Sequence, residues 1–262
     1  MTQQNILHIL QFENLLNYQE IVHFSSTRTG GISSKHLSSL NLGYTVGDNP
    51  LNVTQNLNRL AESIKINKSQ FVFPKQTHSA NIGFVKSEED IFPNTDALIT
   101  NIPGICVAVR TADCVPILLF DPVQKAVAAI HSGWKSTVQK ISQHTIELMQ
   151  KEYGTKPENI VAGIGPSIGP KVYEVGPEVV ELFQKAFGTN HVIKPIANSD
   201  KAYLDLWIAN KQILTNAGVP EKNIEIAEMC TYSNPELFYS ARRDKTKTGR
   251  LASGIMLNQN CK

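Results

Sequence analysis

Apolar residues recur at helical spacing in some segments of the chain and form short runs in others. Val53, Leu57, Leu60 and Ile64 share one side of a predicted helix at 52–64. The same spacing predicts helices at 136–152, with Gly154 as a stop signal, at 177–187 and at 203–216. Short apolar runs predict strands at 71–74, 81–85, 104–110, 115–120, 126–131, 159–164, 223–229 and 251–257. Residues 20–50 are rich in turn-forming residues and are predicted to be loops.

The order of these elements predicts the fold class. Several strands follow one another without a helix between them, which favours an α+β fold with mixed or antiparallel sheets over a doubly wound parallel fold. No linker, repeat or low-complexity tract divides the 262 residues, so a single domain, 1–262, is expected. Residues 1–19 are predicted to be an N-terminal extension, and residues 258–262 a frayed tail in which Cys261 is a free, exposed thiol.

Composition excludes several classes of protein. Hydrophobic content of 41% and charged content of 18% indicate a sizeable core rather than disorder. A net charge of +2 is too small to indicate nucleic-acid binding, and no apolar run approaches the ~18 residues of a membrane span. The N-terminus lacks the features of a signal peptide, and the four cysteines form no CxxC pair. A cytoplasmic protein with reduced thiols is therefore expected.

Three strand ends carry candidate metal ligands. His78 follows a predicted strand in PKQTHS, Cys114 lies between two apolar strands in RTADC, and His131 ends a strand in AVAAIHSGW. Two imidazoles and one thiolate suit zinc and leave a fourth position for water or substrate, which is the catalytic arrangement. Taken singly, each residue is more often a core or hydrogen-bonded side chain, and the spacing matches no local zinc signature. From the residues alone, the site is a hypothesis.

Seven motifs resemble the YfiH/PgeF family, formerly called multicopper polyphenol oxidases or laccases. They run in order from about residue 20 to 257: TRTGGIS, NLGYTVGDNP, KQTHS, RTADCVPILL, AAIHSGW, GIGPSIGP with KVYEVG, and CTYSNPELFYSARRDKTKTGRLAS. The resemblance implies one α+β domain of layered mixed sheets flanked by helices, an α/β/β/α sandwich. It also implies a catalytic zinc bound by His78, Cys114 and His131.

The resemblance further implies an activity. Family members are credited with phosphorolysis of adenosine, inosine, guanosine and S-methyl-5'-thioadenosine, and with adenosine deamination. The implied partners are purine nucleosides and inorganic phosphate. At 132–136 the chain has SGWKS where the family often has AGWRG, so Lys135 keeps the charge of an arginine without its bidentate fork. If this position contacts phosphate or ribose, substrate preference is expected to differ.

Other residues are candidates for supporting roles, each with a structural alternative. Asp113 is expected either to orient a ligand or take a proton, or to anchor a turn. Glu174 is a candidate general acid/base or a solvated loop carboxylate. The remaining candidates for substrate binding are Asn41 and Cys230 as pocket-lining residues, with Cys230 otherwise simply buried, and Arg242 and Arg243 as phosphate ligands in a loop that is otherwise solvated.

Three other functions stay open at this point. Copper-dependent phenol oxidation would use the same cluster, but a multicopper centre needs more histidine ligands than the seven in this chain. Peptidoglycan precursor editing would use Cys114 as nucleophile and His131 as base, although a metal-bound thiolate is a poor free nucleophile. A non-enzymatic protein with a structural zinc would need a fourth protein ligand, and none is obvious.

Overall fold

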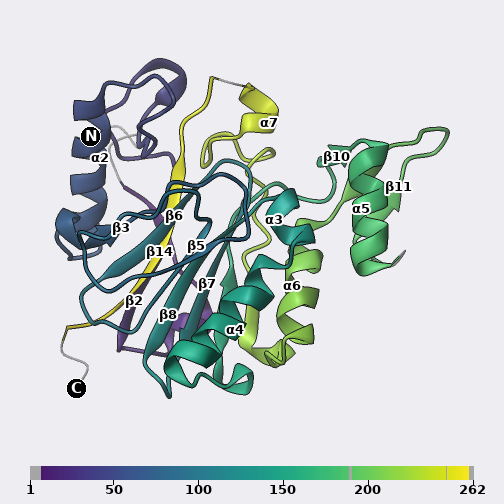
Figure 1. Ribbon diagram of the computed structural model, residues 1–262. Helices are drawn as coiled ribbons and strands as arrows, with labels where there is room; N and C mark the ends of the chain where they lie inside the picture. Colours follow the sequence, from purple (N-terminus) through teal and green to yellow (C-terminus); the bar gives the residue numbers. More distant parts are fainter. Residues whose placement is uncertain (1–6, 189–190, 246, 260–262) are drawn as a thin grey trace.

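Two β-sheets pack face to face in the computed structural model, which describes residues 7–188, 191–245 and 247–259 (Figure 1). The first sheet has the order β1 (Ile9–Leu10), β2 (Ile21–Ser26), β14 (Leu251–Leu257), β6 (Cys106–Thr111) and β3 (Phe71–Val72). The second has the order β13 (Ile224–Ile226), β9 (Val161–Ile164), β7 (Val115–Asp121), β8 (Ala126–Ser132), β5 (Ala97–Thr100) and β4 (Ile82–Phe84).

Helices cover the outer faces of both sheets (Figure 1). Helix α2 (Pro50–Ser63) covers the first sheet, and α3 (Trp134–Val138), α4 (Ile141–Tyr153) and α6 (Leu206–Asn216) cover the second. The described helices also include α1 (Glu13–Leu16), at the margin of the layer between the sheets, α5 (Pro177–Phe187) and α7 (Ala241–Asp244). A third, small sheet of β10 (Glu174–Val175), β12 (Ala202–Leu204) and β11 (Ile193–Pro195) lies beside α5, to one side of the sandwich. None of the described helices has the length and apolar character needed to cross a membrane.

The central strands are apolar on both faces because each face is buried against a different layer. In β6, Val107 and Val109 point into the layer between the sheets, whereas Cys106 and Ala108 pack toward α2. In β7, Leu118 joins the layer between the sheets and its neighbours pack under α4 and α6. The result is the predicted α+β class, an α/β/β/α sandwich, and that prediction is confirmed.

The segment predicted to be an N-terminal extension includes residues of the core. Phe12 and Leu15 belong to the layer between the sheets, with exposed fractions of 3% and 0%. The backbone N–H of Phe12 donates to His23 Nε2 at 2.9 Å. Gly163 leaves the space that the Phe12 ring fills, since a Cβ there would lie 2.5 Å from the ring. The predicted frayed tail begins at Asn258, which hydrogen-bonds to residues 19 and 20, and its last three residues, Cys261 included, lie outside the described residues.

The prediction that residues 20–50 are loops was wrong for β2. Its sequence IVHFSS mixes apolar with polar residues, but the serine side chains find buried partners on the neighbouring strand β14. Ser25 hydrogen-bonds to Ser253 at 2.8 Å, and Ser26 accepts from the backbone N–H of Ala252. The four-residue strand β5 was also not predicted, because ALIT is too short to show a period.

The predicted helix at 136–152 is two helices, α3 and α4. Lys140 adopts a left-handed conformation (φ 56°) between them, which turns the chain after one short helix. Thr137 donates its hydroxyl back to the Gly133 carbonyl at 2.8 Å and stabilises this short helix locally. The predicted helix at 203–216 starts later, at Leu206, because Asp205 caps it by accepting from the backbone N–H of Ile208.

The burial of Phe12 predicts a large effect of its removal. Phe12→Ala is expected to lower the free energy of unfolding by about 3–5 kcal/mol, because it empties a buried ring site between the sheets. Leu16→Ala is the matched control, since Leu16 is 47% exposed and its loss is expected to cost less than about 1 kcal/mol. Urea unfolding followed by circular dichroism measures both. A decrease in the free energy of unfolding that is no larger for Phe12→Ala than for Leu16→Ala would contradict a core role for Phe12.

Candidate metal centre

The side chains of His78, Cys114 and His131 converge at one end of the sandwich. Their ligand atoms all lie within 4.8 Å of one another. The Cys114 Sγ is 3.7 Å from the Nε2 of His78, and the two imidazole rings are 4.9 Å apart, centroid to centroid, at an interplanar angle of 72°. His131 is buried, Cys114 is half-buried and His78 is exposed. The cluster is therefore reached from the side of His78.

Strand pairing explains why these residues meet. Val115 of β7 pairs with Ser132 of β8, so Cys114, directly before Val115, lies opposite Gly133. His78 lies in the segment that leads from β3 in the first sheet to β4 in the second. Cys114 likewise lies where the chain passes from β6 in the first sheet to β7 in the second. Two crossings between the sheets thus meet at the end of β8.

Gly133 provides the room that the cluster needs. A Cβ at this position would lie 3.0 Å from the Cys114 Sγ and 3.0 Å from the His78 Cδ2. Contacts this short are tighter than nine in ten found for real Cβ atoms, so a side chain at 133 would press against both ligands. The three donors therefore surround a space that a larger residue would occupy.

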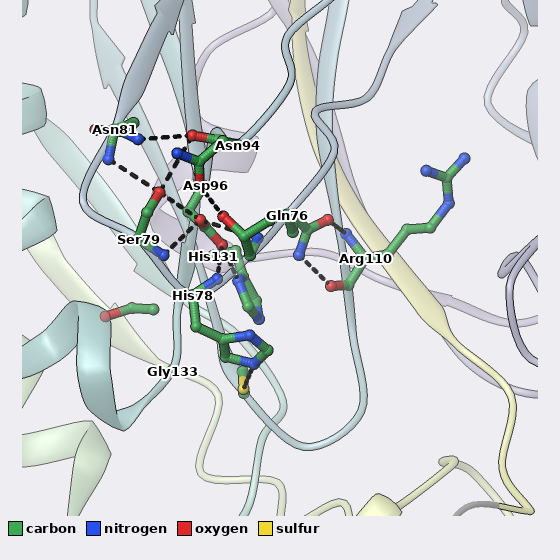
Figure 2. A network of polar contacts seen from close by, with 12 residues as sticks. Gln76, His78, Ser79, Asn81, Asn94, Asp96, Arg110, His131 and Gly133 are labelled. Atoms are coloured by element: carbon green, nitrogen blue, oxygen red, sulfur yellow. Dashed lines mark hydrogen bonds and ion pairs between the residues drawn. The ribbon is translucent and has the colours of Figure 1, made fainter.

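The buried carboxylate of Asp96 organises both histidines (Figure 2). One oxygen is 2.8 Å from His131 Nδ1, and the same oxygen accepts from the backbone N–H of His78 at 3.0 Å. The other oxygen accepts from the backbone N–H groups of Thr77 and Ser79, at 3.2 and 2.7 Å, and from the Ser79 hydroxyl at 2.7 Å. Asp96 thus fixes the ring of one ligand and the backbone of the other.

The turn that carries His78 wraps around this carboxylate in a conformation that non-glycine residues seldom adopt. His78 has φ 61°, in the left-handed region. The turn is also joined to β6, because the Gln76 side chain donates to the carbonyl of Arg110 at 2.7 Å and accepts from its backbone N–H at 2.8 Å (Figure 2). These bonds compensate for the unfavourable backbone conformation and hold the imidazole in place.

The cluster is electrostatically coupled. Burial alone would raise the pKa of Cys114, but the charge of His131 and hydrogen bonds from both imidazoles lower it below the ordinary value of a thiol. Burial alone would lower the pKa of His131, but the Cys114 charge and the bond to Asp96 raise it. Burial opposes ionisation of Asp96 as well, yet its hydrogen bonds with His131 and Ser79 hold its pKa far below the ordinary value. The metal-free cluster therefore favours a thiolate beside an imidazolium.

This donor set fits a bound metal ion. A thiolate and two imidazoles are ligands that zinc and copper both accept. His131 Nδ1 is engaged by Asp96, so Nε2 is the ring nitrogen left for a metal, which is the usual arrangement of a metal-ligating histidine. The space beside Gly133 and the exposure of His78 leave access for a further ligand.

Asp113 connects the cluster to a neighbouring loop. Its carboxylate accepts from the Thr231 hydroxyl at 2.6 Å and from the backbone N–H of Arg242 at 2.8 Å. Both oxygens are used in this way, and the residue is 9% exposed. Of the two roles considered from the sequence, the contacts are those of an anchor, which holds residues 231–242 against the segment leading into Cys114.

The predicted phosphate ligands of this loop have other partners. The Arg243 guanidinium donates to the carbonyls of Thr231, Tyr232 and Phe238 at 2.8–2.9 Å and pairs with Asp244, which uses its hydrogen-bonding capacity in the loop itself.

The three remaining charged candidates, Arg242, Glu174 and Lys135, have partners of their own. Arg242 is exposed, lies 5.1 Å from the Tyr173 ring centroid, and donates to the carbonyl of Glu174. The Glu174 carboxylate forms an ion pair with Lys201 at 2.8 Å, and its side chain is 41% exposed. Lys135 is exposed on α3, with its ammonium 5.5 Å from the Trp134 ring.

Asn41 and Cys230 were predicted to line the pocket. Asn41 is 0% exposed, and its amide bonds to the backbone of Gly43, to Asp48 and to the N–H of Arg250, so it positions a loop. Cys230 accepts from the N–H of Gly169 at 3.2 Å and lines a cavity of about 430 Å³, whose lining does not include the three cluster residues.

Comparison with known proteins shows similarity over almost the whole chain. The family model described as "Multi-copper polyphenol oxidoreductase laccase" matches residues 22–258. A Bacteroides thetaiotaomicron protein named "Purine nucleoside phosphorylase" is 39% identical over 261 residues, covering 96% of this chain and 97% of that protein. A protein from an unknown prokaryotic organism, "Adenosine deaminase RL5", is 37% identical over 242 residues and covers 88% of this chain and 92% of its own length.

Solved structures share the fold over nearly the whole chain. The crystal structure of the Bacillus licheniformis hypothetical protein YfiH superposes with a TM-score of 0.90 at 31% identity, covering 98% of each chain. The similarity therefore includes both sheets, the helices on either side and the end of the sandwich where the cluster lies.

Asp96 is expected to determine how tightly the cluster binds metal. Asp96→Asn is predicted to lower zinc affinity about 10–100-fold, because the amide cannot replace the charged acceptor that orients His131. Competition with a chromophoric chelator measures the change. Asp121→Asn is the control, since Asp121 is a buried carboxylate at the other end of β7 that accepts backbone N–H bonds and contacts no ligand. Unchanged zinc affinity in Asp96→Asn would contradict the role assigned to this carboxylate.

The lowered pKa of Cys114 predicts a reactive thiol in the metal-free protein. Its ionised form is stabilised in the folded state and is lost only when the pH falls below this lowered pKa, so iodoacetamide should still modify Cys114 rapidly at neutral pH. Zinc should protect it. Burial raises the pKa of Cys106, which should stay unmodified in the folded protein. Peptide mass spectrometry separates the two sites, and equal rates for both would contradict the prediction.

Proposed function

The chain belongs to the family described as multi-copper polyphenol oxidoreductase laccase, and we propose that it is a zinc-dependent purine nucleoside phosphorylase. The observation that carries the proposal is the open three-donor cluster of His78, Cys114 and His131, in a chain that aligns almost end to end with a relative named as such an enzyme. The proposed substrates are adenosine, inosine, guanosine and S-methyl-5'-thioadenosine, each with inorganic phosphate.

In this reaction a phosphate oxygen attacks the anomeric carbon of the ribose. The bond from that carbon to the purine nitrogen breaks, and the free base takes up a proton. The sugar product is ribose 1-phosphate, or its 5-methylthio derivative when the substrate is S-methyl-5'-thioadenosine. A zinc ion held by the three residues would supply Lewis-acid stabilisation of developing negative charge. Asp96 holds both imidazoles in orientation, and Asp113 keeps residues 231–242 beside the cluster, where they would border the bound nucleoside.

Deamination of adenosine is proposed as a second activity of the same site. The name of the relative "Adenosine deaminase RL5", which covers 88% of this chain, favours it. Here water replaces the amino group at purine C6 and ammonia leaves. Unlike phosphorolysis, this reaction needs no phosphate, so the two activities are separable by omitting phosphate from the assay.

Copper-dependent phenol oxidation is less well supported, although the family description names it. Within the described residues, the cluster at Cys114 is the one group of three or more close histidine, cysteine or acidic side chains that could hold a metal ion. One such group is not enough for several copper ions. Precursor editing with Cys114 as nucleophile would require a thiolate free of metal. Elemental analysis of protein purified without added metal discriminates among these functions.

The decisive assay incubates the zinc-loaded protein with inosine and phosphate. Hypoxanthine and ribose 1-phosphate are expected in equal amounts, and Cys114→Ala is expected to lose its zinc and to slow the reaction by more than about 100-fold, because several kcal/mol of transition-state stabilisation go with the metal. Cys106→Ala is the control, since Cys106 lies in the core of the other sheet. Absence of any phosphate-dependent product across all four nucleosides would refute the proposal.

A further inference from the structure

Phosphorolysis needs a cationic group that binds phosphate close to the metal cluster. Of the basic residues first suggested by the sequence, Lys135 and Arg242 are exposed, so that solvent screens their charges. Arg243 is saturated by carbonyls of its own loop and by Asp244. Arg242 is directed to Tyr173 and to the carbonyl of Glu174. A different arginine, Arg250, meets the requirement better.

Strand register places Arg250 at the cluster. Leu251 of β14 pairs with Thr111 of β6 in antiparallel register. Arg250 directly precedes Leu251, and the segment that leads through Asp113 to Cys114 directly follows Thr111. The two chain segments therefore lie side by side at the same end of these paired strands.

Arg250 is a half-buried cation without a carboxylate partner among the described residues. Its Nη1 donates to the carbonyls of Gly249 and Thr248 at 3.0 and 3.4 Å, and no described residue accepts from its Nε or Nη2. Its backbone N–H is fixed by Asn41 Oδ1 at 2.9 Å. A desolvated guanidinium with unused donors is costly unless an anion binds to it.

The charge coupling of Arg250 agrees with the placement that the strand register gives. Burial lowers the pKa of Arg250, and the charges of Cys114 and Asp113 act in the opposite direction. These two residues are the metal ligand and the loop anchor described above. Arg110 differs in this respect: burial lowers its pKa too, but the opposing charge is that of Tyr44 and not of the cluster.

Thr248 supplies a second unused polar group beside Arg250. Its hydroxyl is buried without a hydrogen-bond partner, although the residue is only 1% exposed. Its carbonyl accepts from Arg250, so the two residues are in direct contact. Gly43 makes room for the stem of Arg250, since a Cβ there would lie 2.7 Å from Arg250 Cγ. Buried polar groups normally find a partner, and a bound oxyanion would provide one for both residues.

We propose that Arg250 and the Thr248 hydroxyl form the inorganic phosphate subsite of the metal centre. The guanidinium presents unused N–H groups to two phosphate oxygens, and the hydroxyl donates to a third. Asn41 and Gly43 act as positioning residues that fix the backbone and the stem of Arg250. The subsite rests on the proposed phosphorolysis, because it names where that reaction would take its phosphate.

The test separates phosphate binding from turnover. Isothermal titration of the zinc-loaded protein with inorganic phosphate needs no nucleoside, and steady-state assays give the KM for phosphate and for inosine. Arg250→Gln is expected to weaken phosphate binding and to raise the KM for phosphate about 10–100-fold, the value of a lost charge-assisted hydrogen bond, with the KM for inosine nearly unchanged. The phosphate affinity of Arg250→Lys should lie between those of the wild type and Arg250→Gln. Thr248→Val, which keeps the side-chain shape, should also lower phosphate affinity.

Arg59→Gln is the matched control, because Arg59 on α2 also donates to a carbonyl, that of Gly30, away from the cluster. The subsite would be overturned if Arg250→Gln and Thr248→Val both bind phosphate as tightly as the wild type does. It would also be overturned if Arg59→Gln loses as much phosphate affinity as Arg250→Gln. Phosphate binding that is lost in Arg250→Gln would support the subsite even if no nucleoside is cleaved, and in that case the proposed function alone fails.

Discussion

One buried carboxylate, that of Asp96, holds the cluster of candidate metal ligands together. It accepts from three consecutive backbone N–H groups, those of Thr77, His78 and Ser79, and it engages the ring of His131. A backbone N–H that is shielded from water and has no acceptor costs about 1–3 kcal/mol, and one carboxylate satisfies all three. The turn can form because the anion is there, and the anion can be buried because the turn surrounds it. The positions of both histidines follow from this single interaction.

A second carboxylate, that of Asp113, organises the other side of the cluster. It contacts no metal donor, and instead fixes the Thr231 hydroxyl and the backbone of Arg242. The two aspartates thus have different structural roles. Asp96 orders the ligands, and Asp113 orders the loop that borders them. Both lie directly before a strand or a ligand in the sequence, yet each acts on residues that are distant along the chain.

The sequence predicted those parts of the structure that depend on local periodicity. Helix α5 and strand β14 were predicted with the bounds that the structure shows, because α5 has apolar residues at helical spacing and β14 is a short, largely apolar run. The helix at 136–152 was predicted as one piece because its break depends on the left-handed Lys140, a residue type that gives no turn signal. Strand β2 was not predicted because its serines are satisfied by partners more than 200 residues away.

The site shows the same division between local and distant causes. His78, Cys114 and His131 were predicted as ligands from their strand-end positions and from the family resemblance, and the structure brings their donor atoms together. Asp96 was not predicted, since its partners are mainly backbone N–H groups, which carry no sequence signal. Arg250 was also overlooked, because only the pairing of β14 with β6 shows that it lies near Cys114.

The two crossings that carry His78 and Cys114 couple the geometry of the cluster to the spacing of the two sheets. Each crossing passes from one sheet to the other, so the separation of the donors depends on the thickness of the apolar layer between the sheets. That layer acts as a spacer of fixed width, because a close-packed core resists compression. An ion bound at the crossings would in turn cross-link residues that are 36 positions apart in the chain and bind the two sheets at this edge, much as a disulfide would. The interior of the sandwich and the coordination geometry therefore constrain each other.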